Sequence, residues 1–138
     1  MKILNIFAAI LLSLVMVGCG SSNSTPAPSV LAPASISGKT LKVTISSGSG
    51  GFATTGTADF VISNTTNQYT LNGDGVNVAN SAGTFSYSSS GNKGTLAVDD
   101  SAFGNGNYYL TFTSTTSGTF TSNMDQNPSA SQTGSFVV

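Results

Sequence analysis

Cys19 is the residue of this chain whose chemistry is easiest to read. It is the single cysteine among 138 residues, so no disulfide can form within the chain. The sequence also has no histidine, which removes the imidazole base and the commonest metal ligand. A cysteine without a partner in its chain is either a free thiol or a site of covalent modification. Cys19 is therefore a candidate modification site and not part of a thiolate cluster.

Serine and threonine hydroxyls are abundant, but a catalytic nucleophile needs an activating base within reach. After Cys19 the only side-chain amines are those of Lys39, Lys42 and Lys93. A Ser-Lys dyad is one interpretation of these lysines, and solvated lysines on polar strand faces are the one we favour. We therefore expect that the protein is not an enzyme and uses no cofactor.

Oxygen-rich segments could bind calcium at two places. The first is residues 72–77, where oxygen-bearing side chains alternate with other residues. The chain has no glutamate to close a calcium loop, and a hairpin turn explains the same segment more simply. The second is an expected loop over residues 99–107, with oxygen atoms from Asp99, Asp100, Asn105 and Asn107. We predict no metal site, and we expect Asp99 and Asp100 to lie in a solvated turn without sharing a proton.

Three tyrosines are the candidate ligand-binding residues. Tyr69, Tyr87 and Tyr108 all fall on the apolar side of alternating segments, where a buried hydroxyl needs a hydrogen-bond partner. They could line an apolar cavity and anchor a small ligand. Alternatively, large aromatic side chains fill the interior and each hydroxyl lies at a rim. Tyr109 follows the inward Tyr108 and is expected to point outward.

The first 18 residues have the layout of a cleaved signal peptide. Lys2 provides a positive charge, and residues 3–17 are apolar apart from Asn5 and Ser13. Small residues follow at Gly18 and Gly20, on either side of Cys19. This apolar stretch is short for a membrane span, so we predict a secretory signal over residues 1–18.

The segment Met16-Val17-Gly18-Cys19 resembles the lipobox of bacterial lipoproteins, although Met16 and Val17 are less common than Leu and Ala at those positions. The resemblance implies that the Cys19 thiol receives a diacylglyceryl group, that the chain is cut before Cys19, and that its new amine is acylated. Two or more acyl chains give stable membrane attachment. Gly20 is not the aspartate that retains many such lipoproteins in the inner membrane, so the resemblance implies a cell-envelope protein of the outer membrane.

Residues 19–35 are expected to be a flexible linker, because serines are followed by Pro26, Pro28 and Pro33. Residues 36–138 then form one domain. Charge is sparse, with four lysine or arginine and five aspartate or glutamate residues in total. There is no basic patch, which argues against a nucleic-acid partner. Expected partners are the membrane, through acylated Cys19, and either a small apolar ligand or an envelope protein or glycan.

From residue 36 onward apolar residues recur at every second position, which is typical of strands with one buried face. The clearest strand contains Tyr108, Leu110 and Phe112. The other predicted inward positions are Leu41, Val43, Ile45, Ala58, Phe60, Ile62, Tyr69, Leu71, Val76, Val78, Phe85, Tyr87, Leu96, Val98, Phe120, Phe136 and Val138. Turn residues separate these runs, with left-handed backbone expected at Gly91 or Asn92 and a long irregular stretch at residues 123–133.

These strands predict an all-β domain, either a small antiparallel up-and-down barrel of about eight strands or a two-sheet sandwich. We favour the barrel, because few charges or prolines protect an open edge and the last strand could pair with the first. An outer-membrane barrel would need longer strands with outward apolar residues. The glycine-threonine-aromatic strand starts resemble lipocalin-like (calycin) barrels in architecture only, since the lipocalin tryptophan is absent.

The function expected from these observations is that of a membrane-anchored envelope lipoprotein with a non-catalytic barrel for binding or structure. The barrel could hold a small apolar ligand. Alternatively, flat serine- and threonine-rich strand faces, such as the one containing Thr111 and Thr113, could recognise a surface or mediate adhesion.

Overall fold

The computed structural model describes residues 29–138, which form one closed barrel of eight strands. The predicted signal peptide, Cys19 and most of the predicted linker lie outside the described residues. The strands are β1 (Thr40–Gly48), β2 (Gly56–Ile62), β3 (Gln68–Gly73), β4 (Ser81–Ser90), β5 (Lys93–Asp100), β6 (Gly104–Phe112), β7 (Ser117–Met124) and β8 (Asn127–Val137).

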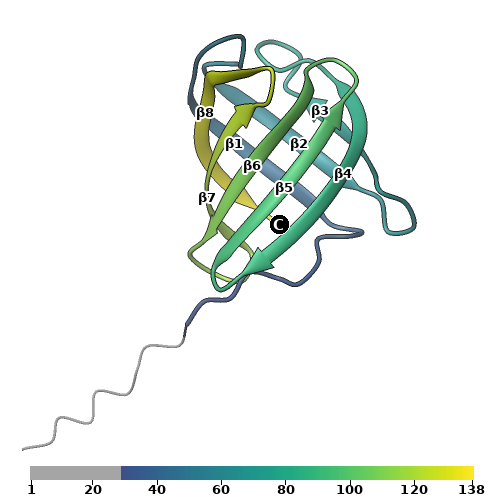
Figure 1. The fold of residues 1–138 in the computed structure, drawn as a ribbon, viewed down its shortest axis with the longest axis vertical. Coiled ribbons are helices and arrows are strands. Elements are labelled where there is room, and N and C mark those ends of the chain that lie inside the picture. The colour runs from purple at the N-terminus through teal and green to yellow at the C-terminus, as the bar shows by residue number, and fades with distance from the viewer. Residues whose placement is uncertain (1–28) are drawn as a thin grey trace, which may run out of the picture.

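Each strand pairs antiparallel with the next, and β8 returns to pair with β1 (Figure 1). The closing pairs include Val43 with Phe136 and Lys42 with Val137. The prediction of an up-and-down barrel is therefore confirmed, including its closure by the last strand, and the two-sheet sandwich is excluded. Closure leaves no long open sheet edge, which fits a chain that carries few charged side chains to protect one.

Apolar and polar residues alternate along the strands, so that the apolar side chains pack in the interior and the polar ones face the exterior. In β1 the side chains of Leu41, Val43 and Ile45 are buried, and the residues between them are exposed. Aromatic rings fill much of the interior: Phe60 contacts both Tyr69 and Tyr108, with ring centroids 5.4 and 5.1 Å apart. Other fully buried side chains are Leu41, Leu96, Leu110, Phe112, Phe120, Phe136 and Ile36.

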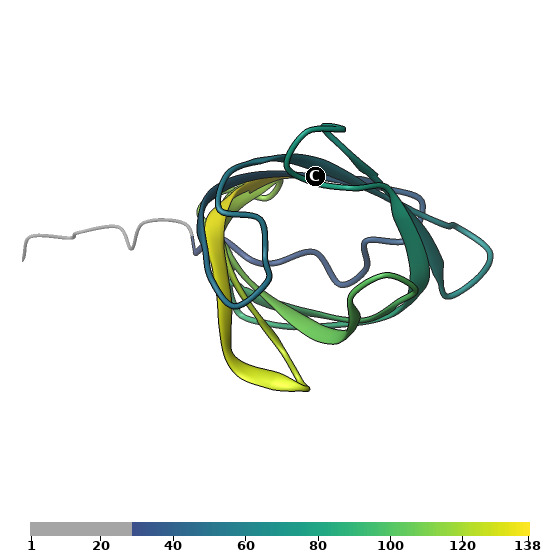
Figure 2. The same ribbon diagram turned by 90° about the horizontal axis from the view of Figure 1, so that it is seen from above.

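One end of the barrel is covered by the chain that precedes β1. The backbone N–H of Ala32 donates to the carbonyl of Gly91 in the β4–β5 turn, at 2.8 Å. Val30 and Ala32 pack against the core, and Ile36 is only 1% exposed. Figure 2 shows this segment crossing the barrel in the view from above. The described part of the predicted linker therefore lies against the domain.

The structure corrects three predictions about loops. Val76 and Val78 are not in a strand: they lie in the β3–β4 loop, where Val76 is 86% exposed and Val78 is buried. Residues 99–107 are mostly strand, because β5 continues to Asp100 and β6 begins at Gly104. Residues 123–133 are likewise mostly strand, since β8 begins at Asn127. The serine- and asparagine-rich composition of these segments is typical of loops. They form strand ends nevertheless, because the hydrogen bonds between strands join backbone groups and depend little on side-chain type.

Two further points concern turns and membrane spans. The β4–β5 hairpin turns at Gly91, whose φ of 56° confirms the expected left-handed backbone there. Among residues 29–138 no helix is long and apolar enough to cross a membrane.

Candidate ligand-binding site

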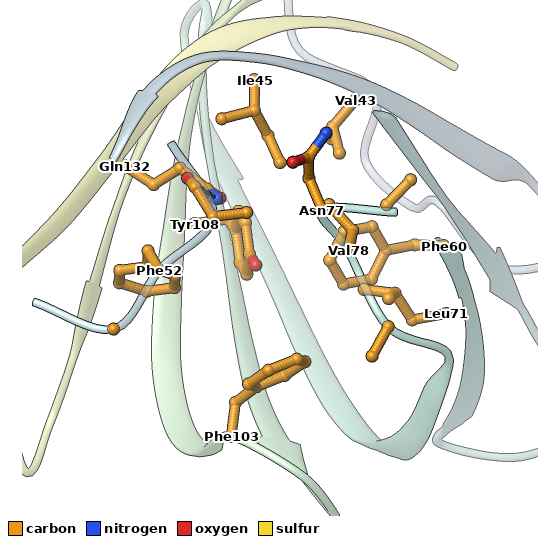
Figure 3. A pocket seen from close by; sticks show the side chains of 14 residues that line it. Val43, Ile45, Phe52, Phe60, Leu71, Asn77, Val78, Phe103, Tyr108 and Gln132 are labelled. Atoms are coloured by element: carbon orange, nitrogen blue, oxygen red, sulfur yellow. Dashed lines mark hydrogen bonds between the residues drawn. The ribbon is translucent and has the colours of Figure 1, made fainter. Parts of the chain in front are cut away.

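A cavity of about 140 Å³ lies at the end of the barrel opposite the segment that precedes β1. In an up-and-down barrel the connections alternate between the two ends. This end carries the β1–β2, β3–β4, β5–β6 and β7–β8 connections, and the first three of them line the cavity. Figure 3 shows the labelled side chains converging from these loops and the strands below them. The cavity is lined by Val43, Ile45, Gly51, Phe52, Ala53, Ala58, Phe60, Leu71, Asn77, Val78, Ala79, Phe103, Tyr108 and Gln132.

Asp100 fastens the β5–β6 loop. Its carboxylate Oδ1 accepts hydrogen bonds from the backbone N–H groups of Ala102 and Phe103, at 2.8 and 3.1 Å. Its Oδ2 accepts from the hydroxyls of Tyr69 and Ser81, at 2.5 and 2.7 Å. These bonds tie β3, β4 and β5 together and hold the 43% exposed Phe103 side chain at the cavity mouth.

Asp74 fastens the β3–β4 loop in the same manner. Its Oδ1 accepts from the backbone N–H groups of Val76, Asn77 and Val78, at 3.0, 2.8 and 3.0 Å. These donors, led by the N–H of Val78, hold the pKa of the Asp74 carboxyl well below its usual value. The loop is thereby folded so that Val78 enters the barrel and Asn77 lies at the mouth.

Gln132 fastens the β1–β2 loop from inside the barrel. Its side chain is 4% exposed, and its Nε2 donates to the carbonyl of Ala53 at 3.0 Å. Ala53 and its neighbour Phe52 line the cavity on that side. Each of the three loops that line the cavity is therefore held by one polar side chain, which limits the conformational entropy lost when a ligand binds.

The Tyr108 hydroxyl is the polar group that faces the cavity most directly. In Figure 3 it points into the space between Phe52 and Phe60. Burial, together with the nearby negative charge of Asp100, raises the pKa of the Tyr108 phenol well above its usual value. No described residue hydrogen-bonds this hydroxyl. It is therefore available to a ligand.

A smaller side pocket of about 20 Å³ adjoins the cavity, since both are lined by Phe52, Phe60 and Tyr108. Its other walls include Tyr69 and Asp100. Burial and then the hydrogen bond to Asp100 raise the pKa of the Tyr69 phenol, so this hydroxyl stays protonated. The side pocket has room for about one water molecule and places polar groups at one edge of an apolar chamber.

The structure brings together two of the three tyrosines predicted to bind a ligand. Tyr108 lines the main cavity and Tyr69 lines the side pocket. Tyr87 is partly buried on β4 and lines neither, because it packs toward Gly94 near the other end. Tyr109 is 44% exposed, as expected for an outward residue. The interior is thus partly filled by aromatic rings and partly hollow, which combines the two alternatives drawn from the sequence.

The candidate calcium segments contain no cluster of three acidic or other metal-ligating side chains within residues 29–138. Asp74 Oδ1 faces three N–H donors, an arrangement that suits a turn and not a cation. The Asp99–Asp100 pair differs from the prediction of a solvated turn, because both residues belong to β5 and Asp100 is 6% exposed. Lys42 forms an exposed ion pair with Asp59, at 2.7 Å, on the outer face. Such a pair contributes little to stability.

Sequence reasoning missed four residues of the site: Phe52, Asp100, Phe103 and Gln132. A signal existed for two of them. Continuing the alternation of Leu96 and Val98 places Asp100 inward, and continuing it backward from Phe136 places Gln132 inward. The two phenylalanines lie in loops, where the period of a strand carries no information.

No family model, curated protein or solved structure matches this chain. The fold and the site therefore define the class on their own: a small closed antiparallel barrel with a preformed, mainly apolar cavity at one end.

Proposed function

We propose that this protein is a membrane-anchored envelope lipoprotein whose barrel binds one small, mostly apolar molecule and performs no catalysis. The observation that carries the binding proposal is the 140 Å³ cavity behind three fastened loops. The anchor proposal rests on the sequence around Cys19, which lies outside the described residues. Eight-stranded barrels either fill with side chains or hold one small ligand, and this interior leaves room for a ligand.

The size of the cavity limits the ligand. Pockets for drug-sized molecules have volumes of about 300–1,000 Å³. An apolar cavity of about 150 Å³ holds benzene, so 140 Å³ corresponds to a single six-membered ring or a short branched chain. A long acyl chain would not fit without displacing Phe52 or Phe103 from the mouth. The ligand class that fits best is therefore a compact molecule of about one ring.

The lining also favours such a ligand. Val43, Ala58 and Leu71 present methyl groups from three neighbouring strands, and Phe60 presents a ring. Filling a void of this kind restores the dispersion contacts that its lining atoms lack. At about 24 cal/mol per Å³ of cavity, complete filling is worth about 3 kcal/mol, so a purely apolar ring should bind in the millimolar range.

Toluene is a suitable probe for this proposal. We expect it to raise the thermal unfolding midpoint of the purified chain in a concentration-dependent manner, because it binds only the folded state. Nuclear Overhauser effects should connect its protons to the methyl groups of Val43, Ala58 and Leu71. The Ala58→Leu variant, which fills the cavity, should show neither effect.

The matched control is Ala97→Leu. Ala97 lies on the outer face of β5, next to the inward Leu96, and does not line the cavity, so this variant should still bind toluene. Absence of both the midpoint shift and the Overhauser effects in the unaltered chain, at the solubility limit of toluene, would overturn the binding proposal.

A further inference from the structure

Asp100 places a negative charge beside the cavity without a compensating cation. Within residues 29–138 the only ion pair joins Lys42 and Asp59 on the outer face, far from this carboxylate in the register of the sheet. Asp100 is 6% exposed and is stabilised by the four hydrogen bonds described above. Four bonds occupy about all the acceptor sites of a carboxylate. Asp100 therefore acts on a ligand through its charge and not by direct bonding.

The Tyr108 hydroxyl lies within the field of that charge. A phenol hydroxyl can donate one hydrogen bond and accept others. The negative charge of Asp100 favours the orientation in which the O–H dipole points its hydrogen toward the carboxylate. The oxygen lone pairs are then free to accept a hydrogen bond from the cavity side.

Ser122 lies beside Tyr108 but lines neither the cavity nor the side pocket. Ser122 pairs with Tyr108 on one side and with Gln132 on the other, so the three inward side chains form a row across β6, β7 and β8. The Ser122 hydroxyl is buried and has no hydrogen-bond partner among the described residues. Gln132, in contrast, already donates to Ala53. Of this row only Tyr108 and Gln132 line the cavity, so the Tyr108 hydroxyl is the group left to bond a ligand.

On this basis we propose that the ligand of the barrel carries a hydrogen-bond donor at one end of its apolar body, such as an alcohol or phenol O–H, which the Tyr108 hydroxyl accepts. The same field excludes carboxylate ligands, because their charge would be buried beside that of Asp100. This inference rests on the proposed function, since it specifies the ligand of the same cavity.

Benzyl alcohol and anisole provide the test, because they are isomers and only benzyl alcohol has a donor. A hydroxyl buried without a partner would make benzyl alcohol the weaker ligand, since it loses more hydration. We expect the opposite order, with benzyl alcohol binding more tightly by up to about tenfold, as one good hydrogen bond allows. Affinities are measured by titrating the chemical shifts of the cavity methyl groups.

Tyr108→Phe removes the acceptor and keeps the ring. We expect the affinity ratio of benzyl alcohol to anisole to fall about tenfold in this variant and anisole affinity to change little. Tyr109→Phe is the matched control. It makes the same substitution at the next residue, whose side chain is exposed on the outer face of the barrel, so the ratio should stay unchanged. If Tyr108→Phe does not fold, the order of the two isomers in the unaltered chain still decides the question.

Benzoate tests the role of charge. We expect it to bind at least tenfold more weakly than benzyl alcohol at neutral pH. Benzoate binding as tight as that of benzyl alcohol, or anisole binding more tightly than benzyl alcohol, would overturn this inference. Failure of toluene, anisole and benzyl alcohol alike would instead overturn the proposed function, so the two failures are distinguishable.

Discussion

Ala58→Leu should stabilise this protein, although most substitutions of a buried alanine by leucine destabilise. Ala58 lies on β2, is 3% exposed and presents its methyl group to the cavity. Leucine adds three carbon atoms at this point. In a packed interior the extra atoms would cause strain of about 1–3 kcal/mol. Here they enter space that the native side chains leave empty.

The size of the effect follows from the cavity. At about 24 cal/mol per Å³, an empty volume of 140 Å³ lowers the free energy of unfolding by about 3 kcal/mol relative to a filled interior. Three buried carbon groups contribute about 0.8 kcal/mol each, or about 2.4 kcal/mol if all three fit in relaxed rotamers. The free energy of unfolding should therefore rise by about 1–2 kcal/mol once residual strain is allowed for.

Urea unfolding followed by circular dichroism measures this change directly. Ala130→Leu is the contrasting variant, because Ala130 is 0% exposed and the backbone of Gly50 packs against it. It should lower the free energy of unfolding by about 1–3 kcal/mol. If Ala58→Leu destabilises the protein as much as Ala130→Leu does, the cavity is not empty space and the reasoning fails.

Three further predictions concern other features. Asp100→Ala removes four accepted hydrogen bonds and leaves the Tyr69 hydroxyl buried without a partner, so the free energy of unfolding should fall by about 3 kcal/mol; a loss under about 1 kcal/mol in urea unfolding would contradict the fastening role. Burial raises the phenol pKa of Tyr69 and Tyr108, so the unfolded chain loses these protons first. Their contribution to stability is intact below about pH 10, and above it the free energy of unfolding should fall by about 1.4 kcal/mol per pH unit for each tyrosine. Urea unfolding at alkaline pH measures this slope, which should be shallower in Tyr108→Phe. Cys19→Ser should move the protein from the membrane fraction to the soluble fraction after cell lysis, and a variant that stays with the membrane would disprove lipid anchoring.

The barrel could be predicted from the sequence because its strands alternate strictly. Leu41, Val43 and Ile45 on β1 and Leu110 and Phe112 on β6 all face inward as expected. Closure was predictable as well, since edge strands with few charged residues or prolines have a physical reason to pair with each other. Both features follow from the alternation of apolar and polar residues and from the scarcity of charged residues and prolines in the strands, which can be read from a single sequence.

The rim of the cavity could not be predicted in the same way. The spacing of Val76 and Val78 fits a period of two and predicts a strand, but Asp74 folds this segment into a loop. The adjacent Asp99 and Asp100 predict a solvated turn, although the alternation of β5 points Asp100 inward. Its burial depends on Tyr69, which is distant in sequence. Long-range partners of this kind are what a single sequence does not reveal.

The two ends of the barrel differ, and this difference restricts how a ligand can arrive. The proposed lipid anchor precedes Ser29, and the chain from Ser29 to β1 covers the end opposite the cavity mouth. An anchored molecule whose covered end faces the bilayer would present its mouth to the aqueous side. Ligand capture would then depend on the concentration dissolved in water and not on the concentration in the lipid. A molecule that partitions almost wholly into the bilayer would rarely reach the mouth, whereas a single ring with one hydroxyl group stays soluble enough to do so.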